Sequence, residues 1–232
     1  MSFLKDIFFP KFCLSCGKPG IYICLNCQKK LEYIKIQKCF YCKKPSLYNL
    51  THQICLKNLS IDQIGSIFYY NDFFKKIIKN IKYRFAKEIF KELFKIINVN
   101  QINFLELYKN LENDVFIQPI PLHKNKFKDR GFNQAFIISQ YLSQLLNFPV
   151  IDILERIKET KNQAEIKDRK KRYQNVRGAF KIKKDVDLNL IKNKRIILVD
   201  DVITTGFTVN EATKILKKAG VIKIYCFTLA QG

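Results

Sequence analysis

The sequence predicts an α/β fold, in which a parallel sheet carries helices on both faces, together with a small cysteine-rich module at the N-terminus. The sheet is predicted by apolar runs typical of buried strands, which alternate with segments of helical periodicity in the second half of the chain. Such alternation is typical of parallel sheets. The module is predicted by the cysteines, because seven of the eight lie between positions 13 and 55.

The composition is that of a globular protein with a large basic excess. The chain has 232 residues, 47% of them hydrophobic, enough for a packed core in one domain or two unequal ones. No apolar run is long enough to cross a bilayer, and charges and a proline interrupt the N-terminal segment. We therefore expect no signal peptide, no membrane insertion and a cytoplasmic location. The formal net charge of +22 suits a polyanionic partner such as nucleic acid, although an A/T-rich genome would also enrich lysine.

The cysteines form closely spaced pairs, three of the type Cys-x-x-Cys and a last pair of the type His-x-x-Cys. A two-residue gap lets both side chains of a pair bind one metal ion, and a tetrahedral zinc site needs two pairs. The pairs therefore predict two structural zinc sites in a zinc-binding module at residues 1–60. The predicted ligands are Cys13, Cys16, Cys24 and Cys27 for one ion and Cys39, Cys42, His52 and Cys55 for the other.

Spacing alone does not fix which pairs share an ion, so an assignment that joins the first pair to the third stays open. A disulfide framework would suit a secreted domain, but the seven clustered cysteines are an odd number. A redox Cys-x-x-Cys motif is expected once, beside a strand–helix–strand unit, and not three times in a row. These arguments favour structural zinc.

We place the second unit at residues 61–232. Residues 64–70 have the pattern of a strand, and Asp72 then begins a long amphipathic helix that reaches about residue 97. A poorly patterned connection follows at residues 98–113. The apolar positions that recur at helical spacing, and that we expect in the core, are Phe74, Ile77, Ile78, Ile81, Phe85, Ile89, Phe90, Leu93 and Phe94.

Strands and helices alternate in the remaining part of the chain. We expect strands at 115–120, 150–153, 195–200 and 222–229, and helices at 131–147 and 207–219. The run from 195 is apolar throughout, as a strand buried on both faces should be. This alternation predicts the parallel sheet.

Two adjacent acids, Asp200 and Asp201, end the apolar run in this otherwise basic chain. With the hydroxylated residues and glycine that follow, they are expected in a strand-to-helix loop at the carboxyl edge of the sheet, where open α/β folds bind ligands. The free N–H groups of a helix start suit a phosphate, and two carboxylates suit two vicinal sugar hydroxyls. The pattern therefore predicts a ribose phosphate site, made by Asp200, Asp201, Thr204, Thr205, Gly206 and Thr208. In an alternative interpretation, the acids only cap the next helix.

The stretch ILVDDVITTGFT resembles the phosphoribosyl pyrophosphate loop of the type I phosphoribosyltransferases. It lacks the Gly-Lys-Ser/Thr ending of a Walker loop and the three glycines of a dinucleotide fingerprint. The resemblance implies that Asp200 and Asp201 hold the ribose hydroxyls and that residues 204–208 surround the 5-phosphate. It also implies a magnesium ion bound with the diphosphate, since hard oxygen ligands and Mg²⁺ pair.

Nearly the whole chain resembles the ComF family, the competence-associated phosphoribosyltransferase-like proteins of bacteria that take up DNA. His52 departs from the family, which more usually has a cysteine there. The resemblance rests on the cysteine pairs, on the stretches PIPLHKNKFKDRGFNQA and VDDVITTG, and on the series Arg156, Gln163, Arg169, Asn175 and Phe180.

The resemblance implies a protein of natural transformation that binds phosphoribosyl pyrophosphate and single-stranded DNA, with DNA-uptake helicase or recombination proteins as candidate partners. It places residues 119–130 where these enzymes bind pyrophosphate, and Arg130 is suited to paired oxyanion contacts. Residues 156–177, rich in Lys and Arg, fall where the enzymes have a mobile catalytic loop.

An alternative is an active phosphoribosyltransferase with an unidentified small-molecule acceptor. The acceptor is not legible in the sequence, and the catalytic residues stay unassigned. The zinc module and the helix at 72–97 are the candidates for covering the site.

Overall fold

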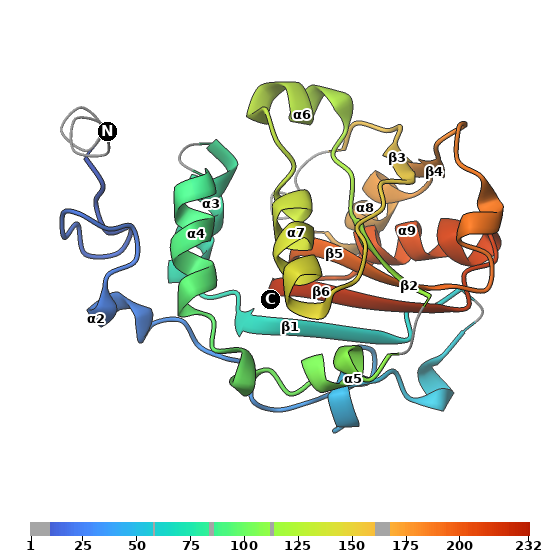
Figure 1. Cartoon of the computed structure of the whole chain (residues 1–232), viewed down its shortest axis with the longest axis horizontal. Helices are drawn as coiled ribbons and strands as arrows, with labels where there is room; N and C mark the ends of the chain where they lie inside the picture. Colours follow the sequence, from blue (N-terminus) through green and yellow to red (C-terminus); the bar gives the residue numbers. More distant parts are fainter. Residues whose placement is uncertain (1–9, 58, 84–85, 112–113, 161–167) are drawn as a thin grey trace.

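The centre of the molecule is a parallel sheet with the strand order β1-β6-β5-β2 (Figure 1). The computed structural model describes residues 10–57, 59–83, 86–111, 114–160 and 168–232. Every neighbouring pair in this sheet is parallel, which confirms the predicted fold class. The strands are β1 (Gln63–Tyr69), β2 (Val115–Pro119), β5 (Arg195–Ile203) and β6 (Lys223–Gln231).

Helices cover both faces of the sheet, because successive side chains of a strand point to opposite faces. In β5, Ile197 and Val199 belong to one apolar cluster, whereas Ile196 and Leu198 belong to another. Of the helices longer than eight residues, the first cluster contains residues of three and the second contains residues of one. The three are α3 (Asp72–Tyr83), α4 (Ala86–Ile96) and α7 (Gln134–Leu146), and the one is α9 (Phe207–Lys218).

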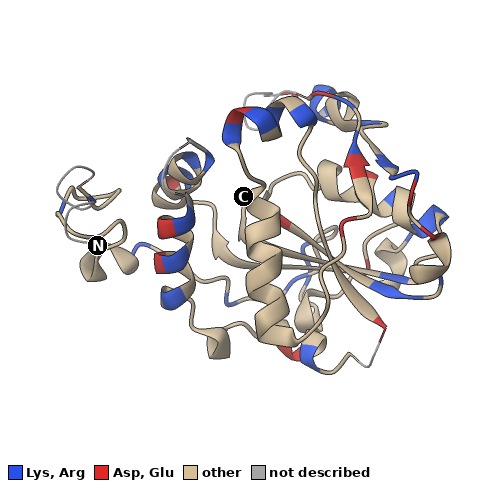
Figure 2. Ribbon diagram, turned by 45° about the horizontal axis from the view of Figure 1, so that its top comes forward, with Lys and Arg blue, Asp and Glu red and all other residues tan. Residues whose placement is uncertain are grey.

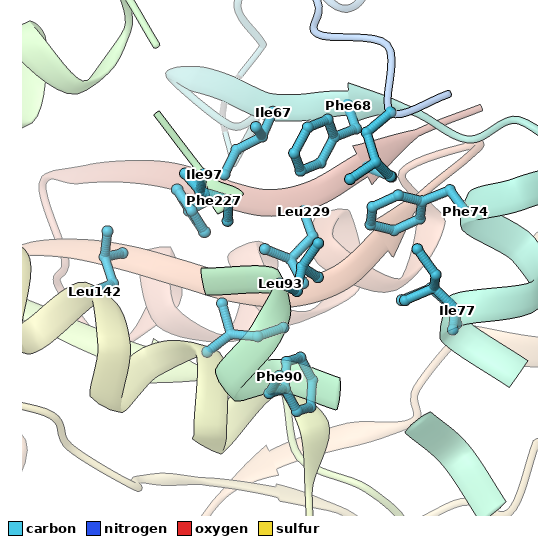
Figure 3. Packing of buried hydrophobic residues seen from close by; sticks show 14 of the residues in the cluster. Ile67, Phe68, Phe74, Ile77, Phe90, Leu93, Ile97, Leu142, Phe227 and Leu229 are labelled. Carbon is cyan, nitrogen blue, oxygen red and sulfur yellow. The ribbon is translucent and has the colours of Figure 1, made fainter. Parts of the chain in front are cut away.

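The first cluster is the larger core, and Figure 3 shows its side chains meeting between the sheet and the helices. Phe74 of α3 and Leu93 of α4 are both fully buried, as are Phe227 and Leu229 of β6. Complete burial of one such side chain contributes about 1.5–3 kcal/mol. The predicted core face of this helical region is therefore confirmed at the positions that the structure describes.

The single long helix expected from Asp72 to about residue 97 is in fact two helices, α3 and α4, which contact each other. The expected helical conformation was right, and the expected continuity was wrong. A periodic apolar stripe shows which side of a helix is buried, and both stripes here enter the same core. It does not show whether the chain turns back between two helices. Phe85 lies outside the described residues.

The strand expected at 150–153 is also absent from the structure. Val150 makes only an isolated bridge to Ile117 of β2. The chain then leaves the sheet edge, because the buried side chain of Gln118 accepts a hydrogen bond from the Ile153 N–H (2.9 Å) in place of a backbone carbonyl. A separate antiparallel ribbon follows, which the sequence did not predict; its strands are β3 (Leu154–Arg156) and β4 (Phe180–Ile182).

Short helices complete the described part of the chain. Asn133 begins α7 by accepting a hydrogen bond from the Ala135 N–H (3.1 Å), so the helix expected at 131–147 starts three residues later. No helix among the described residues is both long and apolar enough to cross a bilayer. The short elements are α2 (Leu25–Gln28), α5 (Leu105–Lys109), α6 (Lys124–Arg130), α8 (Arg169–Val176) and the 3-10 turns at 47–49, 53–55, 99–101 and 188–190.

The cysteine-rich region does not stand apart from the sheet. Cys13 and Cys27 are buried in the same core as α3 and α4. The backbone N–H groups of Tyr22 and Ile23 donate to Glu92 Oε2 of α4, at 2.8 and 3.0 Å. A division into units at residue 60 therefore stays a prediction.

Candidate functional site

The two acids lie within strand β5. We expected the strand to end at residue 200 and the acids to lie in the loop, which was wrong. Pairing continues because β6 offers partners to its end, with Asp200 opposite Thr228 and Ile203 opposite Gln231. The sheet therefore fixes the backbone of both Asp200 and Asp201, and the connection to α9 begins only at Thr204.

The start of α9 is open to a ligand. Gly206 is the N-cap residue, and no side chain caps the helix there. Asp200 Oδ1 instead accepts a hydrogen bond from the Asp201 N–H (2.9 Å), so the interpretation of the acids as helix caps is wrong. The first N–H groups of a helix have no partner inside it and attract anions. Gly206 has φ +73°, the left-handed conformation that favours glycine.

One pocket of about 150 Å³ joins the end of β5, the start of α9 and the α6–α7 turn. The structure therefore brings together every residue that we predicted to bind the phosphoribosyl group. These residues extend over the sequence from Arg130 to Thr208, and the parallel sheet places them at one edge. These lining residues are Arg130, Asp200, Asp201, Thr204, Thr205, Gly206 and Thr208.

The pocket lining also includes residues that we did not predict there, among them Tyr70, Lys82 and Arg156. Lys82 belongs to α3, and its Nζ lies 3.7 Å from Asp201 Oδ2. Helix α3 therefore covers part of the site, as the sequence suggested for this region. In the sequence Lys82 is one of many lysines on a polar helix face, and no signal distinguishes it. Arg156 was noted only as part of the ComF resemblance.

Asp200 is the electrostatically strained group of the site. Burial, followed by the neighbouring charge of Asp201, raises the pKa of Asp200 from its usual 3.8 to about 7. The hydrogen bond from the Asp201 N–H and the charges of Arg156 and Lys82 oppose this rise. At neutral pH the Asp200 carboxyl group is therefore divided between its protonated and ionised forms.

Two buried donors at this pocket have no hydrogen-bond partner among the described residues, Gln134 Nε2 and Arg156 Nε. Each of the two side chains makes one other hydrogen bond: Arg130 Nη1 donates to Gln134 Oε1 (3.3 Å), and Arg156 Nη2 donates to Thr160 Oγ1 (2.5 Å). A buried donor without a partner costs about 1–3 kcal/mol, so such groups are uncommon. Both would be satisfied by oxygen atoms of a ligand in the pocket.

The structure gathers the eight predicted metal ligands into two groups of four, as in the nearest-neighbour assignment. Within each group the candidate ligand atoms lie within 4.8 Å of one another. In the first group, Cys16 Sγ and Cys24 Sγ are 3.6 Å apart. Tetrahedral zinc with bonds of about 2.3 Å holds two sulfur atoms at about 3.8 Å, whereas a disulfide holds them at about 2.05 Å. All eight cysteines are free in the structure. The donor sets fit metal ions.

His52 fits the second group by its hydrogen bonding. Its Nε2 lies 3.0 Å from the carbonyl oxygen of Pro45, and its Nδ1 lies 3.2 Å from Cys42 Sγ. Because a carbonyl only accepts, Nε2 carries the proton, and the lone pair of Nδ1 faces the cysteines. A second hydrogen bond of this kind is typical of histidine ligands of metals.

The basic segment 156–177 is only partly visible, since Gln163 and the rest of 161–167 lie outside the described residues. Its end forms α8, which Asp168 begins by accepting a hydrogen bond from the Lys171 N–H (2.9 Å). Lys171 and Arg177 are exposed. Figure 2 shows that Lys and Arg residues are spread over many elements, and they recur in the sequence of α6, which borders the pocket.

The sheet and its carboxyl-edge pocket define a protein of the type I phosphoribosyltransferase fold, and the phosphoribosyl transferase domain family matches residues 130–232. The chain is 32% identical to competence protein F of Haemophilus influenzae. The alignment covers 97% of this chain and 98% of the relative. It is 28% identical to competence protein ComFC of Bacillus subtilis, over 91% and 85% of the two chains. The chain belongs to the ComF family.

Solved phosphoribosyltransferase structures are also similar to part of the chain. An adenine phosphoribosyltransferase from Thermoanaerobacter pseudethanolicus covers 68% of this chain and 84% of its own, with 15% identity and a TM-score of 0.36. A purine phosphoribosyltransferase from Pyrococcus horikoshii covers 55% and 64%, with 25% identity and a TM-score of 0.31.

Proposed function

We propose that this protein binds phosphoribosyl pyrophosphate with Mg²⁺ and acts in natural transformation, where it handles single-stranded DNA. The competence role is supported by relatives that are named competence proteins and that align with 97% and 91% of this chain. The ligand is supported above all by one observation. Two buried donors that have no partner in the described part of the chain, Gln134 Nε2 and Arg156 Nε, line the same pocket as two acids and a helix start.

The pocket offers opposite charges to the two parts of such a ligand. The open N-terminus of α9 and the hydroxyls of Thr204 and Thr208 suit the 5-phosphate. Asp200 and Asp201 accept hydrogen bonds and would hold the ribose hydroxyls. Arg130 lines the pocket from α6 and suits the diphosphate oxygens, because a guanidinium group can bind two oxygens at once.

Replacement of both aspartates tests this proposal. In the variant Asp200→Asn/Asp201→Asn, size and hydrogen-bonding capacity are kept while two charges are removed. Hydrogen bonds to charged groups are worth about 1.5–3 kcal/mol each, so affinity for phosphoribosyl pyrophosphate should fall at least about ten-fold. Calorimetric titration measures the affinity, and a thermal melt shows whether the fold is kept. Unchanged affinity in a folded variant would contradict the proposal.

For DNA, a groove next to the ribose pocket carries exposed apolar side chains among basic ones. Phe127 is 50% exposed and Phe136 41% exposed, and Lys124 and Lys128 line the same groove. Aromatic side chains stack on bases of single strands, and lysines follow the backbone. Asp152 and Glu155 also line the groove, but each forms an ion pair with a lysine, Lys183 or Lys181.

The groove makes a distinct prediction for DNA. Affinity for a single-stranded oligonucleotide should fall steeply with salt, because each neutralised phosphate releases counterions. Phe127→Ala/Phe136→Ala should weaken it by at least about five-fold, as stacking is worth about 1–3 kcal/mol per base. Phe12→Ala, at another exposed phenylalanine, is the matched control. An affinity insensitive to salt, or to both groove substitutions, would leave the groove without this role.

The alternative, an active phosphoribosyltransferase with a small-molecule acceptor, is favoured by the same pocket. Release of pyrophosphate from radiolabelled phosphoribosyl pyrophosphate, with and without single-stranded DNA, distinguishes turnover from binding alone. Catalysis would rest on positioning and electrostatic stabilisation, since the pocket lining includes no cysteine, serine or histidine among the described residues.

A further inference from the structure

The two residues between the first ligands of the second metal-binding group, Phe40 and Tyr41, reach the start of α9. They stand between Cys39 and Cys42, so the ligands on either side fix their backbone. Neither residue lines the ribose pocket. Both nonetheless contact the residues that shape its phosphate end.

Phe40 lies directly against Gly206. A Cβ atom added at Gly206 would be 3.0 Å from Cε1 of Phe40 and 3.3 Å from its Cζ. Phe40 is 9% exposed and belongs to the core cluster that includes Val209 of α9. Gly206 is thus constrained twice, by its left-handed φ and by the ring beneath it, and the ring supports the turn that presents the first N–H groups of α9.

Tyr41 holds the next position of the same turn. Its hydroxyl donates to Asn210 Oδ1 (2.9 Å) and accepts a hydrogen bond from the Ile61 N–H (3.4 Å). The Asn210 N–H in turn donates to the Gly206 carbonyl (2.8 Å), which closes the first turn of α9. Tyr41 therefore ties this turn to the segment that leads into β1.

The second group is itself anchored to the sheet, so it can act as a fixed support. Leu50 pairs with Gln63 of β1 in an isolated antiparallel bridge. Thr51 Oγ1 donates to the Ile61 carbonyl (2.8 Å), and the Thr51 N–H donates to the Asp62 carbonyl (2.9 Å). The loop of the second group is thereby clamped between the edge of the sheet and the start of α9.

We propose that Phe40 and Tyr41 are positioning residues for the phosphate-binding turn, and that metal in the second group and phosphoribosyl pyrophosphate in the pocket stabilise each other's binding through them. The inference rests on the proposed ligand. Coupling between two sites is reciprocal, so the ligand must raise metal affinity by the same factor as the metal raises ligand affinity. Such coupling is typically about 5- to 150-fold.

The test compares corresponding positions of the two metal groups in the full-length, metal-loaded protein. Tyr41→Phe removes one hydroxyl, and Phe40→Leu keeps an apolar side chain but removes the ring. Leu14→Ala and Ser15→Ala are the matched controls, since these residues stand between Cys13 and Cys16. We expect Phe40→Leu to weaken phosphoribosyl pyrophosphate about five-fold or more, Tyr41→Phe by a smaller factor, and the controls to leave it unchanged.

The second readout is metal retention at equilibrium with a chromophoric chelator. Phosphoribosyl pyrophosphate with Mg²⁺ should raise the retention of one metal equivalent in the unmodified protein and leave the other equivalent unaffected. Phe40→Leu should abolish this increase. The variant Asp200→Asn/Asp201→Asn is the control for a direct effect of the ligand on free zinc. It lacks the acids that bind phosphoribosyl pyrophosphate, so any change in metal retention that remains comes from the ligand in solution.

The outcomes separate the two levels of the proposal. If the unmodified protein does not bind phosphoribosyl pyrophosphate, the proposed function fails. The coupling inference alone is overturned if the unmodified protein binds the ligand but two further results follow. These are that folded Phe40→Leu and Tyr41→Phe bind it equally well, and that metal retention does not change when the ligand is added. An equal loss in the Leu14→Ala control would also overturn it, since that result would reflect general destabilisation.

Discussion

The two metal-binding groups share their ligand spacing but contact different parts of the molecule. The first group packs into the core formed by α3 and α4, and its backbone donates to Glu92 of α4. The second group pairs with the edge of the sheet at β1, and its Phe40 belongs to the cluster on the opposite face and contacts Gly206. No residue of 10–30 lines the ribose pocket or contacts α9 through a hydrogen bond that the structure describes.

The difference teaches that ligand spacing does not define what a structural metal does. Leu14 and Ser15 separate the first two cysteines, and Ser15 Oγ accepts a hydrogen bond from Lys30 Nζ of the same region (2.8 Å). Phe40 and Tyr41 occupy the same positions in the second group and reach the phosphate-binding turn. We therefore expect the first metal to stabilise the fold and the second also to shape the site.

The largest expected effect comes from removing each metal in turn. Purified protein should contain about two zinc ions per chain, and Cys13→Ser/Cys16→Ser or Cys39→Ser/Cys42→Ser should each remove about one. Metal binding free energy is folding free energy, so both variants should be less stable. Only the second should also lose phosphoribosyl pyrophosphate affinity, by ten-fold or more, while the sheet stays folded.

Elemental analysis, circular dichroism and calorimetry check this pair of variants. Well under one zinc ion per chain in the unmodified protein would refute the metal assignment. Equal loss of ligand affinity in two folded variants would remove the distinction between the groups.

The sequence predicted the sheet because its strands are buried on both faces. Arg195–Ile203 and Lys223–Gln231 are nearly continuous apolar runs, and their neighbours have helical periodicity. The short ribbon of β3 and β4 was missed because three-residue strands carry no periodicity. The strand end was misplaced because Asp200 and Asp201 have low strand propensity, and only their pairing with β6 keeps them in the sheet.

The candidate site was predictable where several unusual residues stand together in the chain. The acids, threonines and Gly206 all lie between positions 200 and 208, and their chemistry can be recognised without a structure. Lys82 and Phe40 were not predictable, because each comes from a distant segment and resembles many lysines or buried aromatics. Their roles depend on contacts between segments far apart in the sequence, which local patterns do not encode.

A smaller effect is expected in the pH dependence of ligand affinity, which concerns the pocket beside the second group. This pocket contains the carboxyl group of Asp200, whose pKa is raised to about 7. If the ribose hydroxyls need the ionised form, affinity should fall about ten-fold from pH 8 to pH 6. The reason is that the ionised fraction of a group with a pKa of about 7 falls by about that factor over this range. Because the folded-state pKa exceeds the usual 3.8, the contribution of Asp200 to stability has the opposite trend. It is complete below pH 4 and is lost as the pH rises through 7.

Calorimetric titrations across this range measure the affinity, and thermal melts of the ligand-free protein measure the stability. The phosphates of the ligand also titrate, with a pKa of about 6, so Asp200→Asn is the control that retains their contribution without that of Asp200. The profile of Leu14→Ala in the first group should match that of the unmodified protein. Identical pH profiles with and without Asp200 would exclude its ionisation from binding.

The smallest expected effect tests the first group by its anchor. Glu92 Oε2 accepts two backbone N–H groups, from Tyr22 and Ile23. Glu92→Gln removes the charge but keeps one acceptor oxygen, so the hydrogen bonds are weakened rather than lost, and we expect a loss of about 1 kcal/mol. For a chain of this size the melting temperature should fall by about 2–4 °C.

Affinity for phosphoribosyl pyrophosphate should not change in Glu92→Gln, because Glu92 holds the group that does not contact α9. Lys91→Gln, at an exposed neighbour on α4, should alter neither quantity. A Glu92→Gln variant that bound the ligand several-fold more weakly would show that the first group also communicates with the pocket, through α4 and α3.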